Sequence, residues 1–99
     1  MTTFKSLALA GVATAMMSVA AWAEIKVGAT ISETGPAAFL GDPEAKTLRL
    51  LVDQINAAGG VKGEKIKLVL YDDGGDPNKA RTFATRLVEE DGVVAIIGG

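Results

Sequence analysis

Hydrophobic and polar positions alternate near the start of this chain with the period of a strand. Between residues 25 and 31 every second residue is apolar, as in a half-buried strand: Ile25, Val27, Ala29 and Ile31. A loop is expected over Ser32–Gly41, because Gly35-Pro36 and Gly41 interrupt any regular period. The pattern therefore predicts a strand over 25–31 followed by a loop.

A helical pattern follows this loop. Aspartate is favoured just before the first helical turn and proline fits the first helical position, so Asp42-Pro43-Glu44 predicts a helix start. The helix is expected to end at Gly59-Gly60, because glycine takes positive φ angles without steric cost and lets a helix close on its last carbonyl groups. Its apolar residues recur every three or four positions, as expected for one buried face: Ala45, Leu48, Leu51, Val52, Ile55 and Ala58.

A strand, a helix and another strand are expected in the rest of the chain. Lys65–Tyr71 predicts the second strand, and Asp76-Pro77 repeats the helix-start signal for a helix that runs to about Glu90. The continuous aliphatic run Val93–Ile97 predicts a central parallel strand covered on both faces. The second helix is expected to bury Ala80, Phe83, Ala84, Leu87 and Val88.

The order strand, helix, strand, helix, strand predicts an α/β fold with a partial doubly wound parallel sheet. Right-handed crossovers leave few arrangements of these elements. If the third strand pairs with the first, the strand order is 2-1-3 and the helices cover both faces. Ligands of such sheets bind outside the carboxyl ends of the strands, where neighbouring connections diverge. We therefore expect a ligand crevice between Ser32–Gly41 and the residues that follow Ile97.

The first 23 residues have the pattern of a secretory signal peptide. Met1–Lys5 carries one positive charge, Leu7–Ala20 is almost wholly apolar or small, and Ala21-Trp22-Ala23 has the A-x-A pattern of a cleavage site. The alternatives are a membrane-spanning helix and a buried core helix. A spanning helix needs about 20 apolar residues, and this stretch is shorter. We expect cleavage after Ala23 and a mature chain that begins at Glu24.

The amino-acid composition indicates a cellular compartment and argues against several classes of function. The chain contains no cysteine, so disulfides, thiolate metal sites and a lipid-bearing cysteine are excluded from it. The absence of cysteine and the predicted signal peptide together favour a non-lipidated protein of the bacterial periplasm. The net charge of −2 does not indicate a nucleic-acid partner. Histidine is absent and Ser32 is the only serine after the signal, so no Ser-His or Cys-His pair can form and an enzyme is not expected.

The motifs predict no cofactor and no metal. The segment Gly28–Gly35 does not fit the dinucleotide fingerprint G-x-G-x-x-G, and the phosphate-binding G-x-x-x-x-G-K-[ST] is missing. Asp72-Asp73 could mimic the acid that holds a ribose, and with Asp76 the pair could gather calcium. Their spacing matches no recognised calcium loop. The simpler interpretation is a hydrated turn, with Asp76 as the N-cap of the second helix.

Phe39 and Leu40 are two large apolar residues between the breakers Pro36 and Gly41. One interpretation is that they tuck under their own loop, since small apolar clusters under loops are common. The other is that they face the predicted crevice and touch the apolar part of a small ligand.

Three segments together resemble the N-terminal region of the type I periplasmic binding proteins. They are IKVGATISETGPAAFLGD, VDQINAAGGVKGEKIKLVLYDDGGDP and DGVVAIIGG. The resemblance is specifically to the branched-chain amino acid (leucine/isoleucine/valine-binding) group of ABC-transporter receptors. It implies two α/β lobes joined by a hinge, a ligand clamped between them, and delivery of that ligand to a membrane permease. Residues 24–99 would then be the N-terminal part of ligand-binding lobe 1.

The same resemblance implies site residues and a ligand class. Ser32–Gly41 matches the first cleft loop of the family, in which Leu40 or Phe39 stands where a bulky side chain often meets the ligand. Gly98-Gly99 matches a turn that leads to hydroxyl-bearing residues holding the ligand's charged end. An amino acid, an amide or an aromatic acid is implied, because larger residues in the first helix leave the subgroup open: Thr47, Leu48 and Leu51. The expected ligand-binding residues are Ser32, Phe39, Leu40 and Gly99.

The chain is expected to be a fragment or truncated product that neither folds robustly nor binds ligand alone. A chain as short as 24–99 buries only about 60% of its unfolded surface. It would also expose the apolar edge of Val93–Ile97, which is an association hazard. Two other functions stay open. The lobe could be the extracellular sensory part of a receptor or regulator, or part of a nucleotide-dependent doubly wound enzyme, which the missing fingerprint and the signal peptide disfavour.

Overall fold

The computed structural model describes residues 23–98, in which strands and helices alternate. Residues 1–22, which carry all of the predicted signal peptide except Ala23, lie outside the described residues, as does Gly99. The elements are β1 (Glu24–Ile31), α2 (Ala38–Ala57), β2 (Lys65–Asp72), α3 (Pro77–Glu89) and β3 (Ala95–Gly98).

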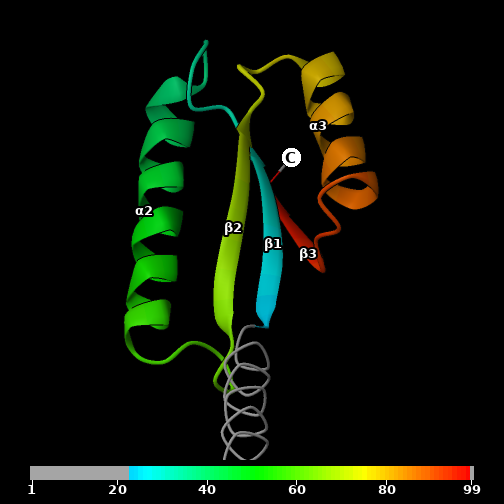
Figure 1. The fold of residues 1–99 in the computed structure, drawn as a ribbon. Helices are drawn as coiled ribbons and strands as arrows, with labels where there is room; N and C mark the ends of the chain where they lie inside the picture. Colours follow the sequence, from blue (N-terminus) through cyan, green and yellow to red (C-terminus); the bar gives the residue numbers. More distant parts are fainter. Residues whose placement is uncertain (1–22, 99) are drawn as a thin grey trace, which may run out of the picture.

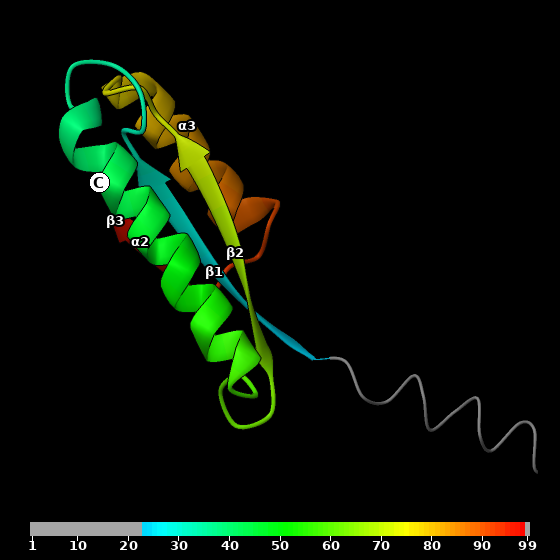
Figure 2. The same cartoon turned by 90° about the vertical axis from the view of Figure 1, so that its left-hand side faces the viewer.

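β1 lies at the centre of a parallel sheet with the strand order β2-β1-β3, which confirms the predicted topology. The register aligns Ile31 with Asp72 on one side and Thr30 with Gly98 on the other. The helices α2 and α3 cover opposite faces of this sheet (Figure 1). Figure 2, seen from the α2 side, shows this helix lying along β1 and β2, both of which it contacts. The carboxyl ends of all three strands therefore meet at one edge of the sheet.

The start of α3 and the end of α2 follow the predicted local rules. Asp76 accepts a hydrogen bond from the backbone N–H of Asn78 at 2.8 Å, and Pro77 occupies the first helical position. At the end of α2, Gly59 and Gly60 have φ angles of 108° and 80°. The Gly60 N–H donates to the carbonyl of Ile55 at 2.8 Å, so the helix closes on its own last turn as expected.

The start of α2 was wrongly predicted. The helix begins at Ala38 rather than after Asp42, and Pro43 lies inside it. Its beginning is set by a turn in which the Ala38 N–H donates to the carbonyl of Gly35 at 3.1 Å. Pro43 lies beyond the first four helical residues, so the carbonyl of Phe39 lacks its usual N–H donor. The expected loop therefore ends at Ala37, and both Phe39 and Leu40 are helical.

Two small apolar layers hold the helices on the sheet. On the α2 face the buried residues are Ala29, Ile31 and Ala45, with Leu48, Leu68 and Leu70 packed against them. On the α3 face Leu87 is fully buried. A Cβ atom at Gly28 would lie 2.8 Å from Leu87 Cδ2, so the glycine permits the close approach of α3 to β1.

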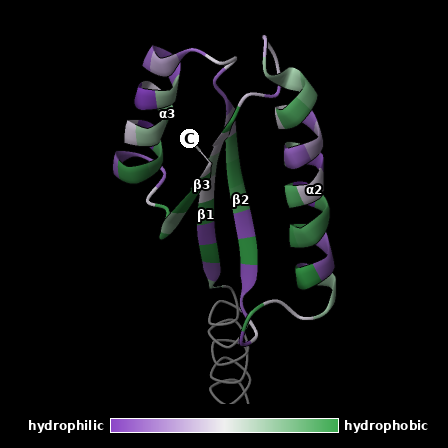
Figure 3. Ribbon diagram, turned by 180° about the vertical axis from the view of Figure 1, so that it is seen from behind, coloured by the Kyte–Doolittle hydropathy of each residue, from purple (hydrophilic) through white to green (hydrophobic). Residues whose placement is uncertain are grey.

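The degree of burial differs from expectation on both helices and on the third strand. Leu51, Ile55 and Ala58, which were predicted for the buried face of α2, are exposed in the described structure. Val88, predicted to be buried, is 61% exposed, because α3 turns its buried face about Leu87 toward the sheet. The third strand begins at Ala95 rather than Val93 and is exposed along its whole length, so the prediction of a strand covered on both faces is wrong for the described residues. Figure 3 shows that β3 is largely apolar, and it pairs with β1 alone. Apolar surface on an outer strand favours association with further structure.

Candidate ligand-binding site

β1 and β3 are neighbours in the sheet, and the helices that connect each of them to β2 cover opposite faces. β1 leads into α2 on one face, whereas β3 is reached through α3 from the other face. In open α/β sheets, such a switch point is where ligands bind. The observed topology therefore places the candidate site where the sequence predicted a crevice.

A cavity of about 200 Å³ lies at this point, and we call it the strand-end pocket. Its walls come from the ends of all three strands and from the first turns of α2. Ser32 and Asp73 lie just beyond β1 and β2, while Leu40 and Glu44 belong to α2. The lining of the strand-end pocket includes Thr30, Ser32, Leu40, Glu44, Asp73 and Gly98.

Gly41 brings α2 close to the end of β1. A Cβ atom at Gly41 would lie only 1.8 Å from the carbonyl oxygen of Ser32, so only glycine fits here. This contact fixes the position of the neighbouring Leu40 over the strand ends. The sequence pattern marked Gly41 as a breaker, but its role is a close approach between backbones.

Asp72 at the end of β2 and Asp73 directly after it hold the loop that follows β1. Ser32 Oγ donates to Asp73 Oδ1 at 2.6 Å, and the Gly75 N–H donates to the same oxygen at 2.9 Å. Asp73 is only 6% exposed. A hydroxyl bonded to a carboxylate at this distance makes a strong, charge-assisted hydrogen bond.

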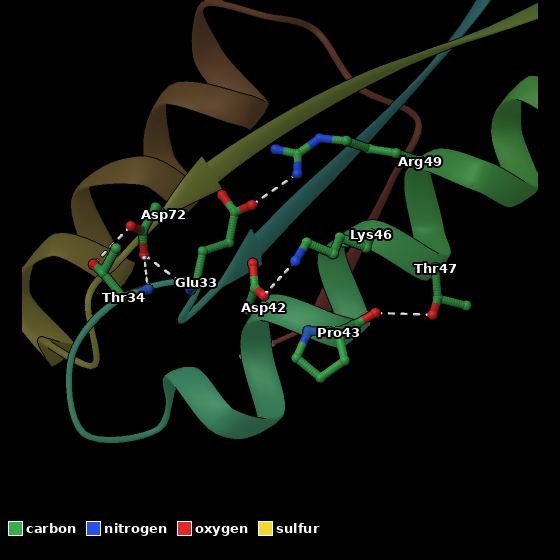
Figure 4. A network of polar contacts seen from close by, with 8 residues as sticks. All are labelled: Glu33, Thr34, Asp42, Pro43, Lys46, Thr47, Arg49 and Asp72. Carbon is green, nitrogen blue, oxygen red and sulfur yellow. Dashed lines mark hydrogen bonds and ion pairs between the residues drawn. The ribbon is translucent and has the colours of Figure 1, made fainter.

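Asp72 makes a second set of contacts to the same loop (Figure 4). Its Oδ1 accepts from the backbone N–H groups of Glu33 at 3.0 Å and Gly74 at 2.9 Å, and its Oδ2 accepts from Thr34 Oγ1 at 2.7 Å. The Thr34 hydroxyl, followed by the Gly74 amide, lowers the pKa of Asp72 from its ordinary value of 3.8, because these bonds favour the charged form. The loop is thus tied to β2 by both aspartates.

Charged side chains on α2 are paired at the rim of this region (Figure 4). Arg49 Nη1 lies 2.7 Å from Glu33 Oε1, and this hydrogen bond raises the pKa of the guanidinium. Lys46 Nζ lies 2.8 Å from Asp42 Oδ2 one helical turn away. Both cations are therefore neutralised by partners outside the strand-end pocket.

An apolar groove of about 560 Å³ adjoins the strand-end pocket between α2 and β3. Ile31, Leu40, Glu44 and Gly98 line both spaces, so the two lie side by side. The apolar side chains that line the groove are Ile31, Leu40, Pro43, Leu48, Leu51 and Ile97.

The structure brings together only part of the predicted ligand-binding set. Ser32 and Leu40 line the strand-end pocket. Phe39 is 75% exposed and lines neither space, and Gly99 lies outside the described residues. The sequence did not single out Glu44 or connect Asp73 to Ser32. For Asp73 a signal existed, since an acid at the end of a parallel strand lies at the ligand edge of the sheet.

The described residues give no indication of a metal centre or a membrane span. Within 23–98, the acidic side chains form no group of three or more that could hold a metal ion. Asp72, Asp73 and Asp76 instead accept hydrogen bonds from neighbouring backbone N–H groups. In the same range of residues, no helix combines the length and apolar character needed to cross a bilayer.

Comparison with known protein families identifies the family to which this α/β chain belongs. The model of a family described as periplasmic binding proteins matches residues 24–99, which is all of the chain after the predicted signal peptide. The chain belongs to the periplasmic binding protein family. Periplasmic binding proteins bind ligands rather than transform them, and membership implies a location outside the cytoplasmic membrane, in the periplasm or the extracellular space.

Similar proteins confirm the predicted resemblance to the leucine/isoleucine/valine-binding group. The chain is 39% identical to an amino acid binding protein of Pseudomonas aeruginosa over 93% of its length, and 46% identical to Leu/Ile/Val-binding protein homolog 7 of Brucella abortus over 77%. It spans only 25% and 19% of the length of these two relatives. Among solved structures, it matches the branched-chain amino acid transporter substrate binding protein LivJ from Streptococcus pneumoniae, in complex with isoleucine. That match has a TM-score of 0.75 at 38% identity and covers 78% of this chain and 22% of LivJ.

Proposed function

We propose that the protein carrying this chain is the substrate-binding component of an ABC importer for branched-chain amino acids or similar small carboxylates and amides. The observation that carries the proposal is that the strand-end pocket and the apolar groove lie side by side and share Leu40 in their lining. A few polar groups next to apolar volume suit a small molecule with a charged end and an aliphatic side chain. The Leu/Ile/Val-binding protein homolog 7 of Brucella abortus and the isoleucine complex of LivJ from Streptococcus pneumoniae support this ligand class.

The remaining parts of the proposal concern export and partners. Residues 1–23 would be a signal peptide cleaved after Ala23, without lipidation, and residues 24–99 would form the N-terminal part of lobe 1. A second lobe would close over the ligand, and a membrane ABC permease would receive it. We propose no catalytic step, no cofactor and no nucleic-acid partner for this lobe.

A sensory role is the second candidate. The chain is 43% identical, with a TM-score of 0.67, to a protein of Rhodopseudomonas palustris described as an extracellular ligand-binding receptor. A sensory lobe would use the same pocket to report a ligand instead of delivering it. Deletion of the gene separates the two roles, because an importer component is needed for uptake of radiolabelled ligand and a sensor is not.

The direct test is a ligand screen on the full-length protein. Leucine, isoleucine and valine should raise the melting temperature in a saturable way, because a ligand that binds only the folded state stabilises it. Amides and aromatic acids are screened beside them. If no compound of these three classes shifts the melting temperature, the proposed function is wrong.

A matched pair of leucines tests the role of Leu40. Leu40 and Leu50 are 55% and 56% exposed and lie on the same helix, but only Leu40 lines the pocket and the groove. Leu40→Ala should weaken leucine binding by roughly 10-fold, since part of a leucine side chain would lose apolar contact with the ligand. Leu50→Ala should leave the affinity within roughly twofold, because Leu50 touches neither space.

A further inference from the structure

Three lysines lie side by side at the amino ends of β1 and β2. The register of these parallel strands sets Lys26 opposite Lys67 and Glu24 opposite Lys65. Because side chains alternate between the two faces of a strand, all four project from one face of the sheet. The three lysine side chains are exposed. We call Lys26, Lys65 and Lys67 the lysine patch, and Glu24 offsets one of its three charges.

The described helix α3 covers the other end of this face and stops where the lysine patch begins. A Cβ atom at Gly28, two residues after Lys26, would lie 2.8 Å from Leu87 in the last turn of α3. Tyr71, further along β2, stacks on Phe83 with ring centroids 4.8 Å apart. β3 pairs with β1 only from residue 27 onward. The amino ends of β1 and β2 therefore extend beyond both α3 and β3 (Figure 1).

The position of Lys26 is unfavourable for the fold alone. Like charges directly opposite each other on neighbouring strands destabilise a sheet, whereas opposite charges stabilise it. Lysines on the outer strand β2 have an ordinary role, since charge protects an open edge from pairing. Lys26 lies on the central strand, where this role does not apply. Within residues 23–98, neither Lys26 nor Lys67 takes part in an ion pair. A negatively charged partner would relieve their repulsion.

We propose that the lysine patch docks the protein weakly and reversibly on an anionic phospholipid surface. Membership of the periplasmic binding protein family implies a location outside the cytoplasmic membrane, so such a surface is close at hand. Each lysine near an anionic membrane strengthens binding by about fivefold. This inference goes beyond the proposed function, because it concerns a surface separate from the strand-end pocket.

The charge at the other end of the strands favours one orientation on the membrane. Glu44 and Asp73 line the strand-end pocket, and Asp72 lies beside it at the end of β2. An anionic surface is attracted to the amino ends of the strands and repelled from their carboxyl ends. The docked protein would therefore stay at the membrane while its strand-end pocket remains clear of lipid.

Vesicle sedimentation with the full-length protein tests the docking. Vesicles of equal parts phosphatidylglycerol and phosphatidylcholine should retain the protein, and vesicles of phosphatidylcholine alone should not. Raising the salt concentration from about 0.01 M to about 0.15 M shortens the screening length from about 30 Å to about 8 Å and should weaken the binding. Lys26→Gln and Lys67→Gln should each weaken it by about fivefold, whereas Lys26→Arg should leave it within about twofold.

Two further variants separate docking from charge in general and from folding. Lys79→Gln removes the same charge from an exposed lysine in the first turn of α3, beyond the carboxyl end of β2, and should leave vesicle binding within about twofold. Lys26→Glu places an acid opposite Lys67, so it should keep or raise the melting temperature while weakening vesicle binding more than Lys26→Gln does. A purely structural role would change the melting temperature without changing vesicle binding.

Each outcome decides the inference. Equal binding to both kinds of vesicle overturns it, as do equal losses in Lys26→Gln and Lys79→Gln. Binding to heparin without binding to vesicles also overturns it and assigns the lysine patch to another kind of polyanion. An amine-reactive reagent should label Lys26 and Lys67 in the full-length protein, and the anionic vesicles should protect both; lysines that resist labelling without vesicles contradict the inference.

Leucine titration of the same variants keeps this inference distinct from the proposed function. The affinity for leucine should be unchanged in Lys26→Gln and Lys67→Gln, because the lysine patch and the strand-end pocket lie at opposite ends of the strands. Intact leucine binding without vesicle binding overturns the docking alone. Vesicle binding that depends on Lys26, in a protein that binds no compound of the ligand screen, overturns the proposed function alone.

Discussion

The side chain of Asn56 pairs with the backbone of Ile66 through two hydrogen bonds. Asn56 Nδ2 donates to the Ile66 carbonyl at 2.8 Å, and Asn56 Oδ1 accepts from the Ile66 N–H at 2.8 Å. A neighbouring strand would offer β2 the same donor and acceptor. Because β2 is an outer strand of the sheet, the last turn of α2 covers part of an otherwise open edge.

Asn56→Ala is expected to lower the free energy of unfolding by about 1–3 kcal/mol, because the half-buried N–H and C=O of Ile66 both lose their partner. Asn56→Asp should give an intermediate loss, since a carboxylate still accepts from Ile66 N but cannot donate to its carbonyl. Urea denaturation of the full-length protein measures both. Gln54→Ala, at an exposed position on the same helix, is the control. An equal loss of unfolding free energy in Gln54→Ala would contradict the role of Asn56 in pairing with the edge of β2.

Gly41→Ala is expected to destabilise the protein by about 1–3 kcal/mol or more, because the new Cβ would meet the backbone carbonyl of Ser32 at 1.8 Å. The clash should also displace Leu40 and weaken ligand binding. Thermal unfolding and ligand titration measure the two effects. Gly28→Ala should cost less, since its Cβ would meet only the end of the Leu87 side chain, which can move. The reverse order would argue against a backbone contact at Gly41.

The Asp72 contacts predict a dependence of stability on pH. The folded state lowers the pKa of Asp72 from 3.8, so these contacts stabilise the fold above that pH. Their contribution should be lost as the pH falls below 3.8 through the lower pKa of the folded state. Asp72→Asn should therefore lower the melting temperature at pH 7 and have a smaller effect near pH 3. Asp53→Asn, at an exposed position of α2, is the control. If the difference in melting temperature between Asp72→Asn and the unaltered protein is the same at both pH values, the charge dependence is refuted.

Leu87 and Val88 form a pair of neighbours with opposite environments. Leu87 is fully buried on the side of α3 that faces the sheet, whereas Val88 is 61% exposed. Leu87→Ala should cost about 2–5 kcal/mol of unfolding free energy through lost burial and the cavity left behind. Val88→Ala should change it by about 0.5 kcal/mol or less, as is usual for exposed positions. Similar losses at both positions would mean that α3 lies on the sheet in a different rotation.

The chain over residues 24–99 is expected to be marginally stable by itself. Only four apolar side chains among the described residues are buried, namely Ala29, Ile31, Ala45 and Leu87, and two of them are alanines. Ten large apolar residues remain exposed, including Ile96 and Ile97 on β3. Circular dichroism and size-exclusion chromatography of the purified segment should show partial unfolding or association. A monomer with a cooperative transition above about 45 °C, as in ordinary mesophilic domains, would disprove this.

The sequence by itself determined the elements and their topology. The period-2 pattern of β1, the Asp76-Pro77 start of α3 and the Gly59-Gly60 end of α2 depend on neighbouring residues only, so local rules were sufficient. Right-handed crossovers left few strand orders, and the predicted order 2-1-3 is the one observed. The start of α2 could not be read in this way. It depends on the turn at Gly35 and on the contact between Gly41 and the Ser32 carbonyl, which involves residues nine positions apart.

Only the tertiary structure decided which residues form the candidate site. Ser32 and Asp73 are separated by 41 positions, and Asn56 and Ile66 by 10, so neither pair leaves a periodic signal in the sequence. Phe39 and Leu40 are adjacent and similar in hydrophobicity, yet one is directed to solvent and the other lines the pocket. Their difference follows from the rotation of α2 about its axis, which the packing of Ala45 and Gly41 on the sheet fixes.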